Sequence, residues 1–130
     1  MKQDLLLDTQ AFLWFWWDDP QLSAAAKAAI CDPSKRKLIS TASAWEVAIK
    51  VSLKTLDMGV PYRGFIHQQM VRNNFEWLQI TDEHLAGVVE LPFHHKDPFD
   101  RMLVAQALYE QTRIVSVDPQ LDAYGVIRIW

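Results

Sequence analysis

The sequence predicts an α/β fold built around a mostly parallel central sheet. Short β-rich runs alternate along the chain with longer segments of helical pattern, and this alternation is typical of a sheet whose crossovers are helices. The chain has 130 residues, of which 50% are hydrophobic, and that is enough for one core. Breakers punctuate the segments without forming a long linker, so we expect one domain over residues 1–130.

The first part of the chain alternates two strand-like runs with helical segments. Three consecutive leucines predict a strand at residues 5–7, and a second β-rich run predicts another at 37–40. Breakers at Pro20, at Pro33 and at Gly59-Val60-Pro61 divide the remaining sequence. Helices are therefore expected at residues 9–17, 23–31, 42–53 and 62–73.

The second part of the chain continues the same alternation. Pro92 separates two helical patterns, Pro98 suits the first position of a helix, and Gly125 precedes the last β-rich run. We expect strands at residues 77–80, 113–117 and 126–130, with helices at 82–89 and 98–111. A short turn or helix should follow Asp118.

The composition argues against several classes of protein. A net charge of -3 gives no overall attraction to nucleic acid, although cations held by carboxylates would reverse the charge locally. Cys31 is the single cysteine, so a disulfide within the chain and a thiolate zinc site are both excluded, and we expect its side chain to be buried. No apolar run reaches the roughly 18 residues of a membrane span, and no signal peptide pattern is present, so a soluble, cytoplasmic protein is expected.

Two aspartates follow predicted strands. Asp8 comes after the leucine run, and Asp118 ends the run Ile114-Val115-Ser116-Val117. The carboxyl ends of parallel strands share one edge of a sheet, where ligands usually bind. Asp8 and Asp118 would therefore meet at that edge if their strands are neighbours, although an aspartate before Pro119 is also a natural turn residue.

A third carboxylate, Glu46, belongs to the predicted helix 42–53. It shares a helical stripe with Ala42 and Ile49, which places a charged group on a core-facing side. The alternative is a capping box, because Ser43-Ala44-Trp45-Glu46 fits the S-x-x-E pattern in which the glutamate reaches back to the cap. Taken alone, the metal and cap interpretations have equal support.

Asp97 and Asp100 surround the start of the predicted helix 98–111. Asp97 is a good N-cap, and Asp100 lies in the first turn, where the helix dipole favours an anion. Asp100 also shares its stripe with apolar Leu103 and Ala107, so its carboxylate should face the sheet. An unpaired charge there is costly, and metal coordination would remove that cost.

Taken together, the acids predict a metal site, because their mutual repulsion would destabilise the fold without a cation. Oxygen ligands suit Mg²⁺ or Mn²⁺ and thus chemistry on phosphate esters. The adjacent pair His94-His95 reads as solvated loop residues rather than ligands. A glycine-rich phosphate loop is absent from the sequence, which argues against nucleotide triphosphate binding.

Several stretches over nearly the whole chain carry a resemblance to a known family. They are Leu6-Leu7-Asp8-Thr9, residues 40–50 with Trp45-Glu46, residues 94–107 with Asp97-Pro98-Phe99-Asp100, residues 115–119 and Tyr124-Gly125-Val126. In these stretches the sequence resembles PIN-domain ribonucleases, specifically the VapC-type toxins of bacterial toxin-antitoxin pairs. The resemblance implies a three-layer α/β/α sandwich and a metal-dependent endoribonuclease, in which Mg²⁺ or Mn²⁺ activates water for in-line attack on an RNA phosphodiester and leaves a 5′-phosphate and a 3′-hydroxyl.

The resemblance also assigns residues and partners. The family's catalytic and metal-binding acids match Asp8, Glu46, Asp100 and Asp118, with Asp97 as an additional or substitute metal ligand and with Thr9 and Ser116 as supporting hydroxyls. Gln10 stands where relatives often have histidine. Relatives commonly form homodimers and are held inactive by a cognate VapB-like antitoxin, so both partners are expected besides RNA.

Two other interpretations and one surface question remain open from the sequence. A receiver-like phosphoacceptor domain also gathers acids at strand ends, and a catalytically silent interaction module would keep the fold but bind metal poorly. The aromatic run at residues 14–17 cannot all be buried by one helix face. Either part of it contacts another protein, or Trp14 and Trp17 fill the core while Phe15 or Trp16 lies against the next segment.

Overall fold

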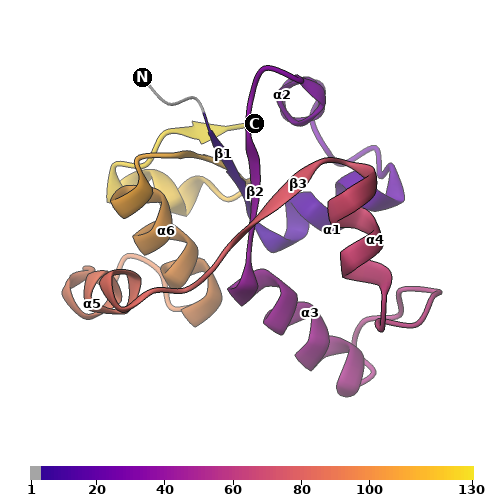
Figure 1. Cartoon of the computed structure of the whole chain (residues 1–130). Coiled ribbons are helices and arrows are strands. Elements are labelled where there is room, and N and C mark those ends of the chain that lie inside the picture. The colour runs from indigo at the N-terminus through magenta and orange to yellow at the C-terminus, as the bar shows by residue number, and fades with distance from the viewer. Residues whose placement is uncertain (1–3) are drawn as a thin grey trace.

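A computed structural model describes residues 4–130 and contains a central sheet in which every strand pair is parallel. Figure 1 shows this sheet at the centre of the molecule, with helices on both sides. Its strand order is β3-β2-β1-β4-β5. The strands are β1 (Leu5–Leu7), β2 (Lys37–Ser40), β3 (Phe75–Leu78), β4 (Arg113–Val115) and β5 (Arg128–Ile129). The expected fold class is therefore confirmed.

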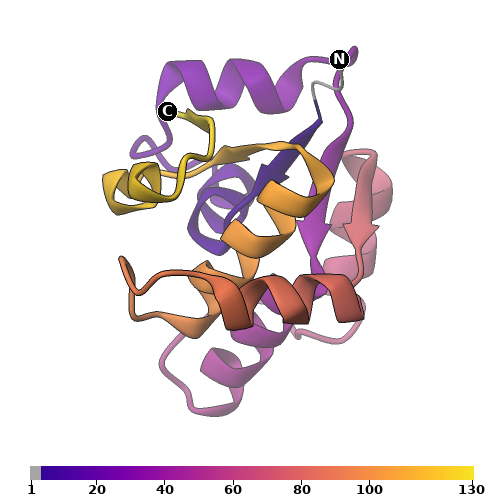
Figure 2. The ribbon, with the colours of Figure 1, turned by 90° about the vertical axis from the view of Figure 1, so that its left-hand side faces the viewer.

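The helices cover the two faces of the sheet. They are α1 (Thr9–Trp17), α2 (Ala24–Cys31), α3 (Thr41–Ser52), α4 (Phe65–Arg72), α5 (Asp82–Glu90), α6 (Pro98–Glu110) and the 3₁₀-helix η1 (Pro119–Tyr124). Figure 1 shows α1 and α4 on one side and α5 and α6 on the other. In Figure 2, which views the molecule from the second side, α5 and α6 lie in front of the strands. This arrangement is the expected three-layer sandwich.

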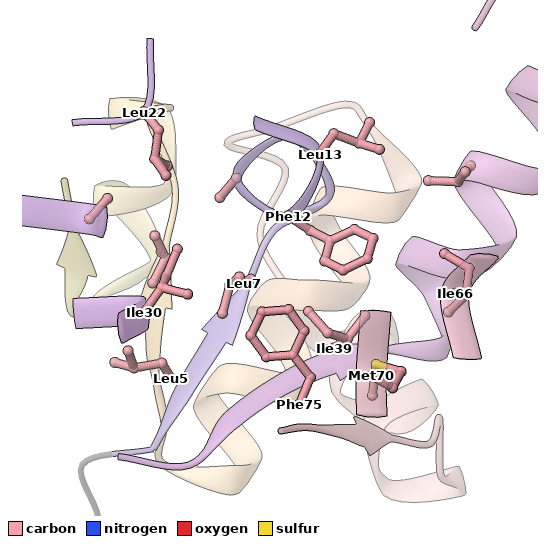
Figure 3. Packing of buried hydrophobic residues seen from close by; sticks show 14 of the residues in the cluster. Leu5, Leu7, Phe12, Leu13, Leu22, Ile30, Ile39, Ile66, Met70 and Phe75 are labelled. Atoms are coloured by element: carbon pink, nitrogen blue, oxygen red, sulfur yellow. The ribbon is translucent and has the colours of Figure 1, made fainter. Parts of the chain in front are cut away.

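Alternation along β1 divides the core into two clusters. Leu5 and Leu7 point to the side of α1 and α4, whereas Leu6 points to the side of α6. Figure 3 shows the first cluster, where Leu7 lies near Phe12 of α1 and Phe75 of β3. All three β1 leucines are completely buried, because a parallel strand inside an α/β sandwich is covered on both faces.

Three residues of the aromatic run at 14–17 are partly buried and pack against this core: Trp14, Phe15 and Trp16. Trp14 packs on Trp130 with ring centroids 5.9 Å apart, and Trp16 packs edge-on against Phe65 at 4.4 Å. Trp17 remains 38% exposed, so the alternative in which it fills the core is wrong. The C-terminal end of the chain supplies the packing partner that sequence periodicity does not reveal.

Several element boundaries differ from those expected. The strand expected at residues 113–117 ends at Val115, where its pairing with both neighbours ends, at Leu7 of β1 and Ile129 of β5. The helix expected from residue 62 begins at Phe65, after Gly64 at φ +83° interrupts helical backbone. The strand expected at 77–80 lies two residues earlier, and that expected at 126–130 contains only Arg128–Ile129.

Cys31 was expected to be buried, but it is exposed, because it is the last residue of α2 and lies outside the buried face formed by Ala26, Ala29 and Ile30. Within residues 4–130, no helix combines the length and the apolar character needed to cross a membrane.

Candidate metal centre

The candidate site lies where the strand order changes direction. From β1 the chain builds outward through β2 and β3 on one side, and then places β4 and β5 on the other. β1 and β4 are direct neighbours, with Leu7 paired to Val115. Asp8 and Asp118 therefore follow adjacent strands at their carboxyl ends, as the sequence predicts, and this is the usual ligand position of an open parallel sheet.

Asp8 is held in place by the start of α1. Its Oδ1 accepts a hydrogen bond from the Ala11 backbone N–H over 2.7 Å, so the side chain is the N-cap of the helix. The pKa of Asp8 is raised to about 6, mainly by burial and also by the charges of Glu46 and Asp118, which together outweigh the hydrogen bonds from Ser116 and Ala11 that lower it. The folded protein thus holds a buried carboxylate among like charges.

Glu46 projects from α3 toward the start of α1. Its Oε1 accepts a hydrogen bond from the Thr9 hydroxyl over 2.7 Å, and its Oε2 lies 2.9 Å from Lys50 Nζ. The capping-box alternative is wrong, because the N-cap of α3 is Ser40, whose hydroxyl accepts from the Ala42 N–H at 3.0 Å. Glu46 is therefore an interior residue of the helix and is free to face the other acids.

Asp97 and Asp100 occupy different roles at the start of α6. Asp97 Oδ1 caps the helix by accepting from the backbone N–H groups of Phe99 at 2.8 Å and Asp100 at 2.9 Å. The pKa of Asp100 is raised to about 7, mainly by burial and also by the charges of Asp97, Asp8 and Glu46, against a lowering effect of His95. One oxygen of Asp97 is thus engaged in the cap, whereas Asp100 contributes to the shared negative field.

His95 is the site residue that the sequence reasoning missed. We expected both histidines to be solvated loop residues, and His94 is exposed, but the His95 ring is only 13% exposed. Its Nε2 lies 2.8 Å from Asp118 Oδ2 and 3.4 Å from Asp100 Oδ2. The available signal was its position two residues before the N-cap Asp97, whose N–H lies 3.1 Å from His95 Nδ1.

The two hydroxyl residues expected beside the acids are both buried at the site. Thr9 binds Glu46 and lies 3.0 Å from the Ser43 hydroxyl. The Ser116 hydroxyl accepts a hydrogen bond from the Asp118 backbone N–H over 3.1 Å. These contacts orient the carboxylates and leave oxygen atoms available.

The residues present fit a hard divalent cation. The acids come from four different elements of the fold, yet their charges reach one another: Glu46 and Asp118 help to raise the pKa of Asp8, and Asp8 and Glu46 help to raise that of Asp100. His95 Nε2 and one carboxylate oxygen from each of Asp100 and Asp118 lie within 4.8 Å of one another, so these two carboxylates are close enough to share one ion. A donor set dominated by carboxylate oxygen matches the preference of Mg²⁺ or Mn²⁺.

Comparison with solved structures shows that the fold is shared. VapBC2 from Rickettsia felis, solved with a DNA fragment from their promoter, superimposes with a TM-score of 0.71 at 10% identity and 97% coverage of both chains. VapBC-1 from nontypeable Haemophilus influenzae gives 0.66 at 13% identity, with 97% of this chain and 96% of that chain covered. A toxin-antitoxin complex from Klebsiella pneumoniae gives 0.59 at 20% identity, with 88% and 86% covered.

The sequence matches a family model but no individual curated protein. No curated protein matches the chain significantly. The family model described as PIN domain, in contrast, matches residues 5–127, a range that includes each acid of the candidate site. Because this match covers almost the whole chain and agrees with the sheet order and the position of the acids, the chain belongs to the PIN domain family.

Proposed function

We propose that the protein is a metal-dependent endoribonuclease and the toxin of a VapBC-like toxin-antitoxin pair. The observation that carries this proposal is the convergence of Asp8, Glu46, Asp100 and Asp118 at one sheet edge of a PIN domain. Four acids that repel one another need a cation, and a cation beside a phosphodiester supplies the chemistry of hydrolysis.

The acids and the hydroxyl residues of the site have different roles in the proposed reaction. The cation, Mg²⁺ or Mn²⁺, would be held by Asp8, Glu46, Asp100 and Asp118. Asp97 is an additional or substitute metal ligand. The bound cation would polarise the scissile phosphate and lower the pKa of an attacking water. Thr9 and Ser116 fix the orientation of the acids through their hydroxyl groups, and the caps at Asp8 and Asp118 tie two of the acids to rigid backbone.

The proposed protein partner is an antitoxin of the VapB type, with a homodimer of this chain as the second assembly. Two of the structural neighbours are VapBC proteins, and another is described as a toxin-antitoxin complex. The negative charge of the acid cluster would attract a guanidinium group from such a partner, which could replace the cation among the carboxylates. An inserted arginine would therefore compete directly with Mg²⁺.

The decisive experiment measures cleavage of a mixed pool of structured and single-stranded RNA by the purified protein. We expect cutting with Mg²⁺ or Mn²⁺ and none with EDTA. Asp8→Asn, Glu46→Gln, Asp100→Asn and Asp118→Asn should each lower the rate by at least ~100-fold, because each removes a negative ligand. Glu90→Gln, at an exposed position on α5, is the matched control and should cut normally.

Two outcomes would overturn the proposal. Cutting that persists in EDTA and in all four variants would identify a contaminating nuclease. Weak Mn²⁺ binding together with no cutting of RNA, in protein free of any antitoxin, would favour the silent interaction module. A matched single-stranded DNA substrate separates ribonuclease activity from general nuclease activity.

A further inference from the structure

The loop between α5 and α6 is fastened to the rest of the molecule by one tyrosine. Tyr124, at the end of η1, uses its hydroxyl oxygen to accept hydrogen bonds from the backbone N–H groups of His94 at 3.0 Å and His95 at 2.9 Å. Its ring also packs edge-on against His94 with centroids 5.0 Å apart. The backbone carrying His95 is therefore fixed to the segment that follows Asp118.

A buried arginine fastens the start of the same loop. Arg101 is 5% exposed and donates hydrogen bonds to the carbonyl oxygens of Pro92 at 2.8 Å and Leu91 at 3.1 Å. It also donates to the Tyr124 hydroxyl at 3.2 Å and lies 4.0 Å from the centre of the Phe93 ring. These contacts tie the backbone of the loop to α6 and to Tyr124 of η1.

The hydrogen bonds of His95 determine which of its nitrogens carries a proton. Nδ1 lies 3.1 Å from the backbone N–H of Asp97, and that group can only donate. Nδ1 must therefore be the bare, accepting nitrogen, and the ring hydrogen belongs to Nε2. Nε2–H then points at Asp118 Oδ2 over 2.8 Å, with Asp100 Oδ2 at 3.4 Å.

We propose that His95 is a positioning residue, which donates its Nε2–H to Asp118 and does not itself bind the cation. A metal-binding imidazole needs a bare nitrogen facing the ion, and here the bare nitrogen faces the backbone of Asp97 instead. The proposal deepens the proposed function, on which its catalytic meaning rests. The hydrogen bond itself can be tested without any RNA.

The geometry leaves Asp118 able to bind a cation. Its Oδ1 accepts from the Gln120 N–H at 2.9 Å, and its Oδ2 accepts from His95. Each carboxylate oxygen has two lone pairs, so one on each oxygen stays available. A donor that fixes a ligating carboxylate in this way raises metal affinity by holding the ligand in its binding orientation.

The role of His95 affects which metal ion the site selects. If His95 were a ligand, the set His95, Asp100 and Asp118 would offer nitrogen together with oxygen and would favour Zn²⁺. With His95 as a donor, the ligands are all oxygen and favour Mg²⁺ or Mn²⁺. The role of one ring nitrogen thus decides the class of metal.

The first test observes the ring nitrogens directly by long-range ¹H–¹⁵N NMR of the imidazole side chains, at pH 8, with EDTA, with Mg²⁺ and with Zn²⁺. We expect Nε2 of His95 to be protonated and Nδ1 to be bare in EDTA, and both to stay so when Mg²⁺ is added. His67, exposed on α4, is the reference ring. A bare Nε2, or an Nε2 signal that shifts to a metal-bound position with Mg²⁺, would overturn the proposal.

The second test measures Mn²⁺ affinity by calorimetry in two variants. His95→Ala removes the donor and should weaken binding by about 10–100-fold. His95→Gln places an amide N–H near the position of Nε2 and should bind within a few-fold of the unaltered protein. Equal affinity in all three proteins, or equal losses in both variants, would overturn the positioning role.

Two controls keep these results interpretable. Urea unfolding of both variants shows whether a loss of affinity reflects a loss of folding, and His67→Ala should leave Mn²⁺ binding unchanged. RNA cleavage is assayed separately on the same samples. Absence of cleavage with intact metal binding would count against the nuclease proposal alone, whereas a ligating His95 would count against the positioning proposal alone.

Discussion

The hydroxyl of Thr9 donates a hydrogen bond to Oε1 of Glu46 over 2.7 Å, and this contact joins the first residue of α1 to the middle of α3. The two residues are 37 positions apart in the chain, and both are buried. The bond gives a buried carboxylate a neutral donor on one oxygen, while Lys50 contacts the other. One hydroxyl thus couples helix packing to the orientation of a site acid.

Replacing Thr9 by valine should destabilise the protein by about 1–3 kcal/mol, because a buried carboxylate oxygen loses its donor while the side-chain volume is kept. Thr9→Ser keeps the hydroxyl and should retain most of the stability. Urea unfolding in EDTA measures both. If Thr9→Val and Thr9→Ser unfold at the same urea concentration, the hydrogen bond makes no measurable contribution.

The metal-free protein should lose stability as the pH rises from 5 to 8. The folded-state pKa values of Asp8 and Asp100 are raised to about 6 and about 7, so the folded state binds more protons than the unfolded state between their ordinary pKa near 4 and those values. The free energy of unfolding therefore falls as pH rises through this window. In EDTA we expect a melting temperature lower by roughly 3 °C or more at pH 8 than at pH 5.

The same mechanism predicts what restores the stability at pH 8. Mg²⁺ binds the ionised acids of the folded state and should raise the melting temperature there. Asp100→Asn removes one of the two groups and should make the metal-free protein less sensitive to pH. A variant that keeps the full pH dependence would show that Asp100 does not cause it.

Tyr124→Phe should weaken both stability and metal binding. The substitution deletes the acceptor for two backbone N–H groups of the loop that carries His95, at a cost of about 1–3 kcal/mol. Mn²⁺ affinity should fall several-fold, because His95 is no longer held against Asp118. Tyr109→Phe, at an exposed tyrosine on α6, is the control and should change neither quantity in urea unfolding or calorimetry.

Trp45 should contribute to binding single-stranded RNA if the proposed function holds. It is 63% exposed, precedes Glu46 in the chain, and packs edge-on against Phe99, which precedes Asp100, with centroids 5.5 Å apart. An aromatic ring beside the acids can stack on an unpaired base, so Trp45→Ala should weaken binding by about 5–100-fold. Trp17→Ala, at the far end of α1, is the control. Equal RNA affinity in both variants, by fluorescence anisotropy, would exclude stacking on Trp45.

Much of the fold and part of the site were determined by the sequence alone. Local chemistry sets where several elements begin, because Asp8, Asp97 and Asp118 each accept backbone N–H bonds at the start of the helix that follows. The alternation of short apolar runs with helical patterns gave the α/β class, and residues 9–17 were predicted as the helix that α1 forms. Such features depend on neighbours within a few positions.

Only the tertiary structure decided how these pieces meet. The adjacency of β1 and β4, which brings Asp8 to Asp118, depends on packing between segments more than 100 residues apart. The choice of Ser40 over Ser43 as the cap of α3 depends on where β2 ends, and β2 extends to Ser40 because that residue pairs with Leu78 of β3.

The role of His95 could not be predicted from the sequence. The one local difference from His94 is its position two residues before the N-cap Asp97, and that position does not reveal the contact with Asp118. Its ring reaches Asp118 because Tyr124 and Arg101, from two other elements, hold the loop backbone against the site. A side chain's role in a loop is set by the long-range contacts that fix the backbone, and the sequence pattern carries no periodic signal for those contacts.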